Sequence, residues 1–210
     1  MVSSRIRPPI CWVSALSGVP AMRGSWSRCT KTAERSGQSG GYEKFFAKEG
    51  SDYLNGMPED DFIFVEEGHI FDLGGVTAEV VEIPGHTPGS IGLLVKEKRL
   101  FLASDGVNAN TWLFLPESQK LSVYQDTLKK IQKLDFDYLL TGHSLKLEPK
   151  ANLQDYLAVA MNPDLENASV QKPNSFAPGV TPLRCLDKAN RGKRRKDRNK
   201  AGIVISKDKL

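Results

Sequence analysis

Histidine and cysteine are scarce in this chain of 210 residues, which has only three of each. The cysteines Cys11, Cys29 and Cys185 are odd in number and widely spaced, so they predict neither a disulfide framework nor a Cys-x-x-Cys zinc clip. A long apolar run is also lacking, because no stretch approaches the roughly 18 apolar residues of a membrane span. Prolines interrupt the arginine-containing start, which leaves no apolar core for a secretory signal. We therefore expect a cytoplasmic protein without a membrane partner.

Negative charge is lacking at both ends of the chain. The net charge of +4 hides an uneven distribution, with +5 over residues 1–41, −9 over residues 42–183 and +7 over residues 184–200. The central part is acidic, and the basic character belongs to the ends.

Residues 1–41 lack helical or strand periodicity and are rich in Ser, Gly and Arg, so we expect a disordered leader there. After Gly41 the pattern becomes regular. Strands are predicted over residues 62–65, 70–73, 76–83, 91–95, 100–103 and 136–140, and helices over residues 42–54 and 151–161. The strands at 91–95 and 100–103 should form a hairpin. Residues 162–182 resemble a loop, residues 184–200 form a charged run, and residues 203–205 are expected to be an edge strand.

The clearest helix is predicted to begin near Ser122. Ser122 and Gln125 have the spacing of a capping box. One apolar face follows, made of Tyr124, Leu128, Ile131 and Leu134.

Three polar residues of the kinds that bind metal stand directly after apolar runs. His86 lies between the pairs Pro84-Gly85 and Pro88-Gly89, Asp105 follows residues 100–104, and His143 follows residues 138–142. Zinc binds imidazole nitrogen and carboxylate oxygen, so three such residues at the ends of predicted strands indicate a hydrolytic zinc centre. Taken singly, each residue also fits a structural role. His86 could be an ordinary turn histidine, Asp105 a helix or turn cap, and His143 a structural histidine with satisfied hydrogen bonds. The third histidine, His69, lies in an acidic turn and is not counted as a ligand.

The order and spacing of the PGHTPGS turn, the strand ending in Asp105 and the Thr-Gly-His motif at His143 resemble the metallo-β-lactamase superfamily, including its glyoxalase II-like hydrolases. The resemblance runs from about Tyr42 to about Met161. It implies an α+β fold, the αβ/βα sandwich of that family, with one or two zinc ions. It also implies that His86 binds the first metal ion, Asp105 bridges the two, and His143 binds the second.

The family's His-x-His-x-Asp-His motif is missing ahead of the PGH turn, where His69 is the only histidine. The chain thus looks like the C-terminal half of such an enzyme, truncated before residue 42, and no catalytic residue can be named. We expect a metal-dependent hydrolase of small-molecule esters, thioesters or lactams that is impaired or inactive as an isolated chain. The alternative is a non-catalytic remnant.

The expected domains are a leader over residues 1–41, a partial metallo-β-lactamase-like domain over residues 42–165, and a loop with a basic segment over residues 166–210. The basic run at 188–200 would allow a nucleic-acid-binding module. It contains no aromatic residue for base stacking, and the acidic centre would repel a polyanion, so nucleic acid is not the preferred partner. Loss of the partner half would expose a sheet edge, which predicts self-association.

Overall fold

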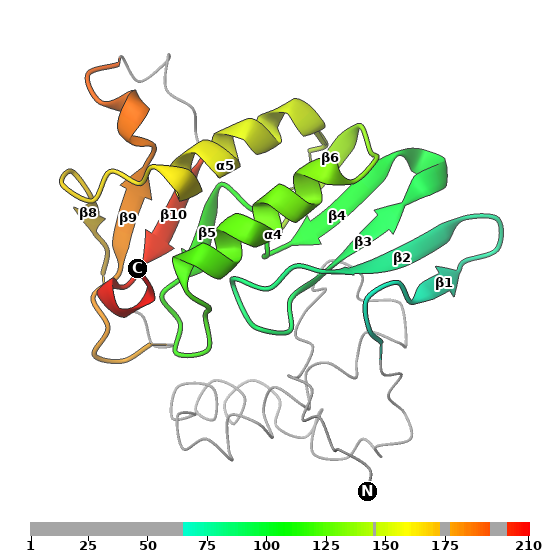
Figure 1. Ribbon diagram of the computed structural model, residues 1–210, viewed down its shortest axis with the longest axis horizontal. Helices are drawn as coiled ribbons and strands as arrows, with labels where there is room; N and C mark the ends of the chain where they lie inside the picture. Colours follow the sequence, from blue (N-terminus) through cyan, green and yellow to red (C-terminus); the bar gives the residue numbers. More distant parts are fainter. Residues whose placement is uncertain (1–64, 145, 173–176, 194–200) are drawn as a thin grey trace, which may run out of the picture.

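The computed structural model describes residues 65–144, 146–172, 177–193 and 201–210. The expected leader, the helix at 42–54 and most of the strand at 62–65 lie outside the described residues. Within them, two β-sheets lie beside each other and two α-helices cover one face (Figure 1). This mixed architecture confirms the predicted α+β class.

The larger sheet has six strands in the order β1-β2-β3-β4-β6-β7. These strands are β1 Ile70–Asp72, β2 Thr77–Glu82, β3 Ile91–Val95, β4 Leu100–Ser104, β6 Tyr138–Thr141 and β7 Glu148–Pro149. Strands β1 to β4 form antiparallel neighbours, whereas β6 joins β4 in parallel. The hairpin predicted from β3 and β4 is confirmed, and its turn is a 3-10 helix, Lys96–Lys98.

Side chains of this sheet alternate between two apolar faces. Val81, which lies between Val80 and Glu82, packs in the main core below the helices. Val80 instead joins a second cluster with its cross-strand partner Leu93. A strand that is apolar on both sides is typical of a sheet buried on both faces. This explains why the sequence of β3 is a continuous apolar run rather than an alternating one.

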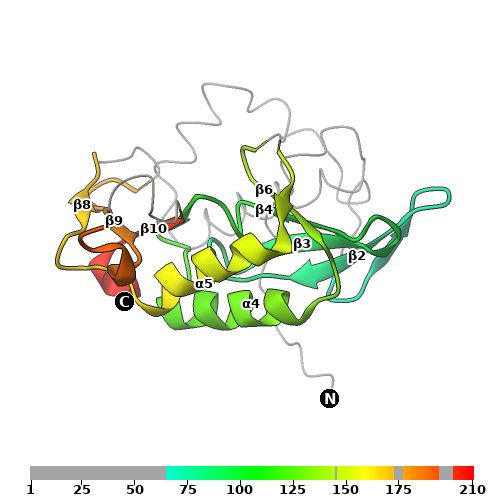
Figure 2. The same cartoon turned by 90° about the horizontal axis from the view of Figure 1, so that it is seen from above.

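The two helices lie side by side on the same face of the strands (Figures 1 and 2). They are α4, Leu121–Lys133, and α5, Leu153–Met161, which follows a 3-10 turn. The predicted apolar face of α4 is buried as expected, although Leu134 is the residue after the helix. The capping-box interpretation of Ser122 is wrong, because the helix begins at Leu121 and its N-cap, Lys120, makes no side-chain cap. Gln125 instead donates through Nε2 to the Ala160 carbonyl at 2.8 Å and ties α4 to α5.

The smaller sheet has four strands in the order β5-β10-β9-β8. These strands are β5 Asn110–Leu113, β8 Ser169–Val170, β9 Leu183–Leu186 and β10 Gly202–Ile205. The loop expected over residues 162–182 contains β8, and the charged run expected from residue 184 begins within β9. The prediction of an edge strand at 203–205 is also wrong, since β10 pairs with β5 on one side and with β9 on the other.

The physical reason lies in the core. Ile203 and Ile205 are fully buried and pack in the main cluster together with Cys185, the residue opposite Ile203. Residues 166–210 therefore supply three strands rather than only a loop and a basic segment, while the domain boundaries stay a prediction. Burial raises the pKa of the Cys185 thiol to about 11, so this cysteine stays protonated at neutral pH. Among the described helices, none is long and apolar enough to cross a bilayer.

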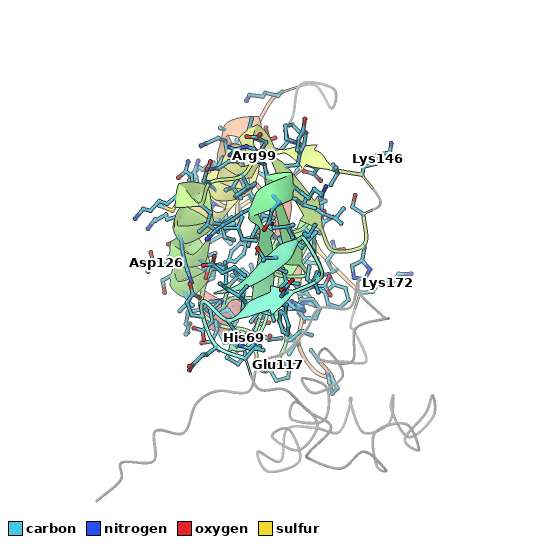
Figure 3. The ribbon with its side chains drawn as sticks, turned by 90° about the vertical axis from the view of Figure 1, so that its right-hand side faces the viewer. His69, Arg99, Glu117, Asp126, Lys146 and Lys172 are labelled. Atoms are coloured by element: carbon cyan, nitrogen blue, oxygen red, sulfur yellow. The ribbon has the colours of Figure 1, made fainter. Side chains whose placement is uncertain are left out.

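Arg99 fastens the end of the β3–β4 hairpin to the segment that leads into β6 (Figure 3). Its guanidinium donates to Asp137 at 2.6 Å and to Asp135 at 2.8 Å, and these hydrogen bonds lower the pKa of both carboxyl groups. The Arg99 carbonyl also accepts the backbone N–H groups of Asp137 and Tyr138. The register of β6 against β4 is thus fixed at the end opposite the candidate centre.

Candidate metal centre

The pairing of β4 with β6 brings Asp105 and His143 to one edge of the larger sheet. The strands are parallel, and Ser104 lies opposite Thr141, so the residues that follow each strand emerge together. Strand β2 is antiparallel to β3, and β3 is antiparallel to β4, so β2 and β4 run in the same direction. The loop carrying His86, which follows β2, leaves the sheet at this same edge.

Asp105 and His143 are in contact. His143 Nε2 lies 3.1 Å from Asp105 Oδ1, with the Asp105 side chain 17% exposed and the His143 side chain 81% exposed. The two atoms are close, yet their geometry is not that of a hydrogen bond, and Oδ1 is buried with no hydrogen-bond partner in the described part of the chain. A buried carboxylate oxygen normally has a partner, so this one calls for an explanation. A carboxylate oxygen and an imidazole nitrogen are two of the donor types that zinc binds, but a zinc site needs at least three protein ligands.

The backbone at this edge is in unusual conformations. Ser104 has φ 47° and His143 has φ 60°, both in the left-handed region that residues with a Cβ seldom adopt. Between them, the Gly142 N–H donates to the Ser104 carbonyl at 2.6 Å. A Cβ on Gly142 would overlap Asp105 Oδ1 and lie 2.7 Å from the Ser104 carbonyl oxygen, so only glycine fits there. Local strain of this kind persists only where the surrounding structure enforces it, and it often accompanies function.

His86 is held by a different kind of contact. It is half-buried in the loop between β2 and β3, and its Nδ1 lies 2.8 Å from the carbonyl oxygen of Trp112 in β5. A carbonyl can only accept, so Nδ1 must carry the proton, and in the neutral ring Nε2 then has a free lone pair. Histidines that bind metal usually donate their other ring N–H to a carbonyl or carboxylate in this way. The imidazole is therefore already in the tautomer that a metal ligand needs.

The loop around His86 packs tightly. A Cβ on Gly85 would lie 2.8 Å from the Tyr124 ring, so α4 and the loop can approach each other only because residue 85 is glycine. Thr87 and Ser90 close the loop, with their hydroxyls 2.8 Å apart and the Thr87 N–H donating to the Ser90 hydroxyl at 3.1 Å.

The three predicted ligands are not all brought together. Asp105 and His143 touch, and His86 lies on the loop at the same edge. Even so, the described part of the chain contains no group of three or more His, Cys, Asp or Glu side chains placed to hold a metal ion. His69, which was not counted as a ligand, packs edge-on against Phe71, with ring centroids 4.7 Å apart (Figure 3). Lys146, three residues after His143, lies at the periphery of the molecule (Figure 3).

The contribution of Trp112 was missed in the sequence because its role depends on a backbone carbonyl, which any residue provides. The residues of β5, Asn110–Leu113, do not alternate between polar and apolar types, so no periodicity in the sequence indicated this strand.

Known proteins resemble this chain over parts of its length. A hydroxyacylglutathione hydrolase, GloC, from Haemophilus influenzae is 43% identical over 42 residues, which is 20% of this chain and 20% of that protein. An archaeal metallo-β-lactamase superfamily protein from Sulfolobus tokodaii has a TM-score of 0.44 at 22% identity, covering 60% of this chain and 49% of that one. ETHE1 from Myxococcus xanthus has a TM-score of 0.41 at 20% identity, covering 48% and 47%. The chain thus spans half or less of each of these three proteins.

A family model gives a broader match. The model described as the metallo-β-lactamase superfamily matches residues 15–143, more than half of the chain, and ends at the predicted ligand His143. The matched range begins at residue 15, whereas the sequence motifs placed the start of the resemblance at about residue 42. The chain belongs to the metallo-β-lactamase superfamily.

Proposed function

We propose that this protein is a metal-dependent hydrolase of esters, thioesters or lactams, impaired in the isolated chain because no His-x-His-x-Asp-His motif is present. The observation that carries the proposal is the contact between His143 and the buried Oδ1 of Asp105, which has no hydrogen-bond partner among the described residues, at the sheet edge that also bears His86. The name of the GloC relative, a hydroxyacylglutathione hydrolase, supports the thioester class.

In this proposal three side chains hold the metal. His86 offers Nε2, which its hydrogen bond to Trp112 leaves unprotonated, and Asp105 offers a carboxylate set between strand ends. His143 is mostly exposed, so it is the ligand that can move to meet an ion. A bound zinc ion would lower the pKa of water toward neutrality and polarise a substrate carbonyl.

The alternative is a non-catalytic remnant that keeps the fold. It is favoured by the finding that the described residues contain no group of three side chains placed to hold a metal. A nucleic-acid-binding module acting through the basic run at 188–200 is a weaker proposal, and it requires binding that falls steeply with salt.

The deciding experiment measures zinc, iron and manganese per chain in the purified protein and in a His86→Ala/His143→Ala variant. His69→Ala is the matched control, because it removes the remaining histidine without touching the centre. Metal near one or two equivalents that is lost only in the double variant supports the hydrolase, and thioester hydrolysis is then assayed. Equal metal content in all three proteins supports the remnant.

We also propose self-association through the β1 end of the larger sheet. Among the described strands, β1 is at one end of the larger sheet. Ile70 in β1 is 59% exposed and Leu73, the residue after it, is 56% exposed. Light scattering should show association that Ile70→Lys reduces, because a charged side chain opposes pairing at a sheet edge. A monodisperse wild-type monomer would contradict this proposal.

A further inference from the structure

Three consecutive carbonyl groups of the His86 loop accept hydrogen bonds from one short segment of the chain. The Pro84 carbonyl accepts from the Thr127 hydroxyl at 2.5 Å, the Gly85 carbonyl from the Gln119 N–H at 2.8 Å, and the His86 carbonyl from the Ser118 hydroxyl at 2.8 Å. The donors lie in the turn before α4 and in α4 itself, the elements that come after β5 in the chain, and the Trp112 carbonyl of β5 holds the imidazole. The backbone of the His86 loop and the ring of His86 are thus both held by residues between Trp112 and Thr127.

Only two of these donors are side chains, and both are buried. Ser118 and Thr127 are each 3% exposed, so water cannot easily replace either hydroxyl. The Ser118 hydroxyl also accepts the Leu115 N–H at 3.2 Å, which closes the turn that presents it. Thr127 lies in α4, which packs against α5. The two hydroxyls therefore fix the loop relative to the helix layer as well as to β5.

We infer that Ser118 and Thr127 are positioning residues that set the orientation and tautomer of His86 for metal binding. This inference rests on the proposed function, because the orientation of His86 matters only if its ring binds a metal ion. Without the Ser118 hydroxyl the His86 carbonyl loses its donor, and without the Thr127 hydroxyl the Pro84 carbonyl loses its donor, so we expect the loop to shift to find a partner. A shift of the His86 backbone lengthens the contact from Nδ1 to the Trp112 carbonyl. The proton is then free to move to Nε2, where it blocks the ligand lone pair.

The test uses Ser118→Ala and Thr127→Val in the full chain, with two measurements. Imidazole ¹⁵N–¹H NMR of the metal-free protein, above the titration range of histidine, reports the tautomer of His86, assigned with a His86→Gln variant. Zinc affinity from competition with a chromophoric chelator reports the effect on binding. We expect a single Nδ1–H tautomer in the wild type, a mixture in both variants, and a zinc affinity lower by about 10- to 100-fold.

The controls separate positioning from general loss of stability. Ser118→Thr and Thr127→Ser keep the hydroxyls and should restore the tautomer and the affinity. Tyr124→Phe removes another buried hydroxyl, which bonds Thr111 at 3.0 Å and none of the three carbonyls, so it should keep both. If Ser118→Ala fails to fold, the Thr127→Val and Thr127→Ser pair still decides the question.

The outcomes are distinct. Folded variants that keep the single tautomer and the wild-type zinc affinity overturn the inference. A wild type that binds no zinc overturns the proposed function, whereas the NMR measurement still decides whether Ser118 and Thr127 orient His86.

Discussion

The loop that carries His86 and the strand ends that carry Asp105 and His143 are held in different ways. The His86 loop is fixed by a hydrogen bond that His86 donates to β5, and by hydrogen bonds that it accepts from the turn before α4 and from α4 itself. The other side has two residues with left-handed backbone and a buried carboxylate oxygen without a hydrogen-bond partner.

This difference separates a prearranged ligand from a strained pair. The carbonyl groups of Pro84, Gly85 and His86 and the Nδ1 atom of the His86 ring all have hydrogen-bond partners. The His86 side therefore stabilises the fold. On the Asp105 side, a buried carboxylate oxygen has no hydrogen-bond partner among the described residues and the backbone is strained, and each of these lowers the stability of the fold. If the protein binds a metal ion, the ion would add more stability at the Asp105 side than at the His86 side.

The largest expected effect is that of Gly142→Ala. The added Cβ would overlap Asp105 Oδ1 and lie 2.7 Å from the Ser104 carbonyl oxygen, so the backbone of β4 or β6 must move. We expect the free energy of unfolding to fall by about 1–3 kcal/mol, which is typical of overpacking. Chemical denaturation measures this change.

Gly68→Ala is the comparison for that variant. Gly68 has φ 80° with open space around it, so alanine there tests backbone strain without a clash. If Gly142→Ala is no more destabilising than Gly68→Ala, the close packing at the Asp105 side is not as tight as described.

Ser104→Gly should raise the free energy of unfolding, whereas Gly142→Ala should lower it. It relieves a left-handed residue and removes a buried hydroxyl that has no hydrogen-bond partner among the residues the structure describes, so we expect a gain of about 1–2 kcal/mol in the free energy of unfolding. Ser104→Ala removes only the hydroxyl, and thermal unfolding should place it between the wild type and Ser104→Gly. A loss of stability in Ser104→Gly would show that this residue is not strained.

Much of the fold was predictable because it depends on local patterns. Apolar runs predicted β2, β3, β4 and β6, and a helical period predicted α4. Strand β5 and the central position of β10 were not predicted, because the two strands pair across about 90 residues and neither signals its partner locally.

The candidate centre divides in the same way. Residue type and spacing placed His86, Asp105 and His143 at strand ends, and the parallel pairing of β4 with β6 explains why two of them meet. The sequence could not predict that the Trp112 carbonyl orients His86, since backbone acceptors have no residue signature. Nor could it predict left-handed backbone at Ser104, where a glycine would have been the usual indication.

A smaller effect should distinguish the two histidines in the metal-free protein. His143 has φ 60° and a side chain that is 81% exposed, so His143→Gly should raise the free energy of unfolding by about 0.5–1 kcal/mol. His86→Gly should lower it, because the Trp112 carbonyl loses its donor and a half-buried ring is removed. Changes of equal sign in differential scanning calorimetry would contradict the contrast between the two sides.

Acid should lower the stability of the protein through a contact outside the candidate centre, the pair of Asp164 and Arg191. Hydrogen bonds from Arg191, the closest at 2.6 Å, and from Asn167 lower the pKa of Asp164 to about 2, below its ordinary value of 3.8. A lowered carboxyl pKa adds stability that is complete above the ordinary value and is lost as the pH falls from about 4 to 2. Asp164→Asn should therefore flatten the acid limb of a plot of unfolding temperature against pH. Arg191→Gln should flatten it in the same way, and the double variant should add little, because each change breaks the same pair. If the acid limb is unchanged in both variants, the loss of stability at low pH comes from a contact other than the pair of Asp164 and Arg191.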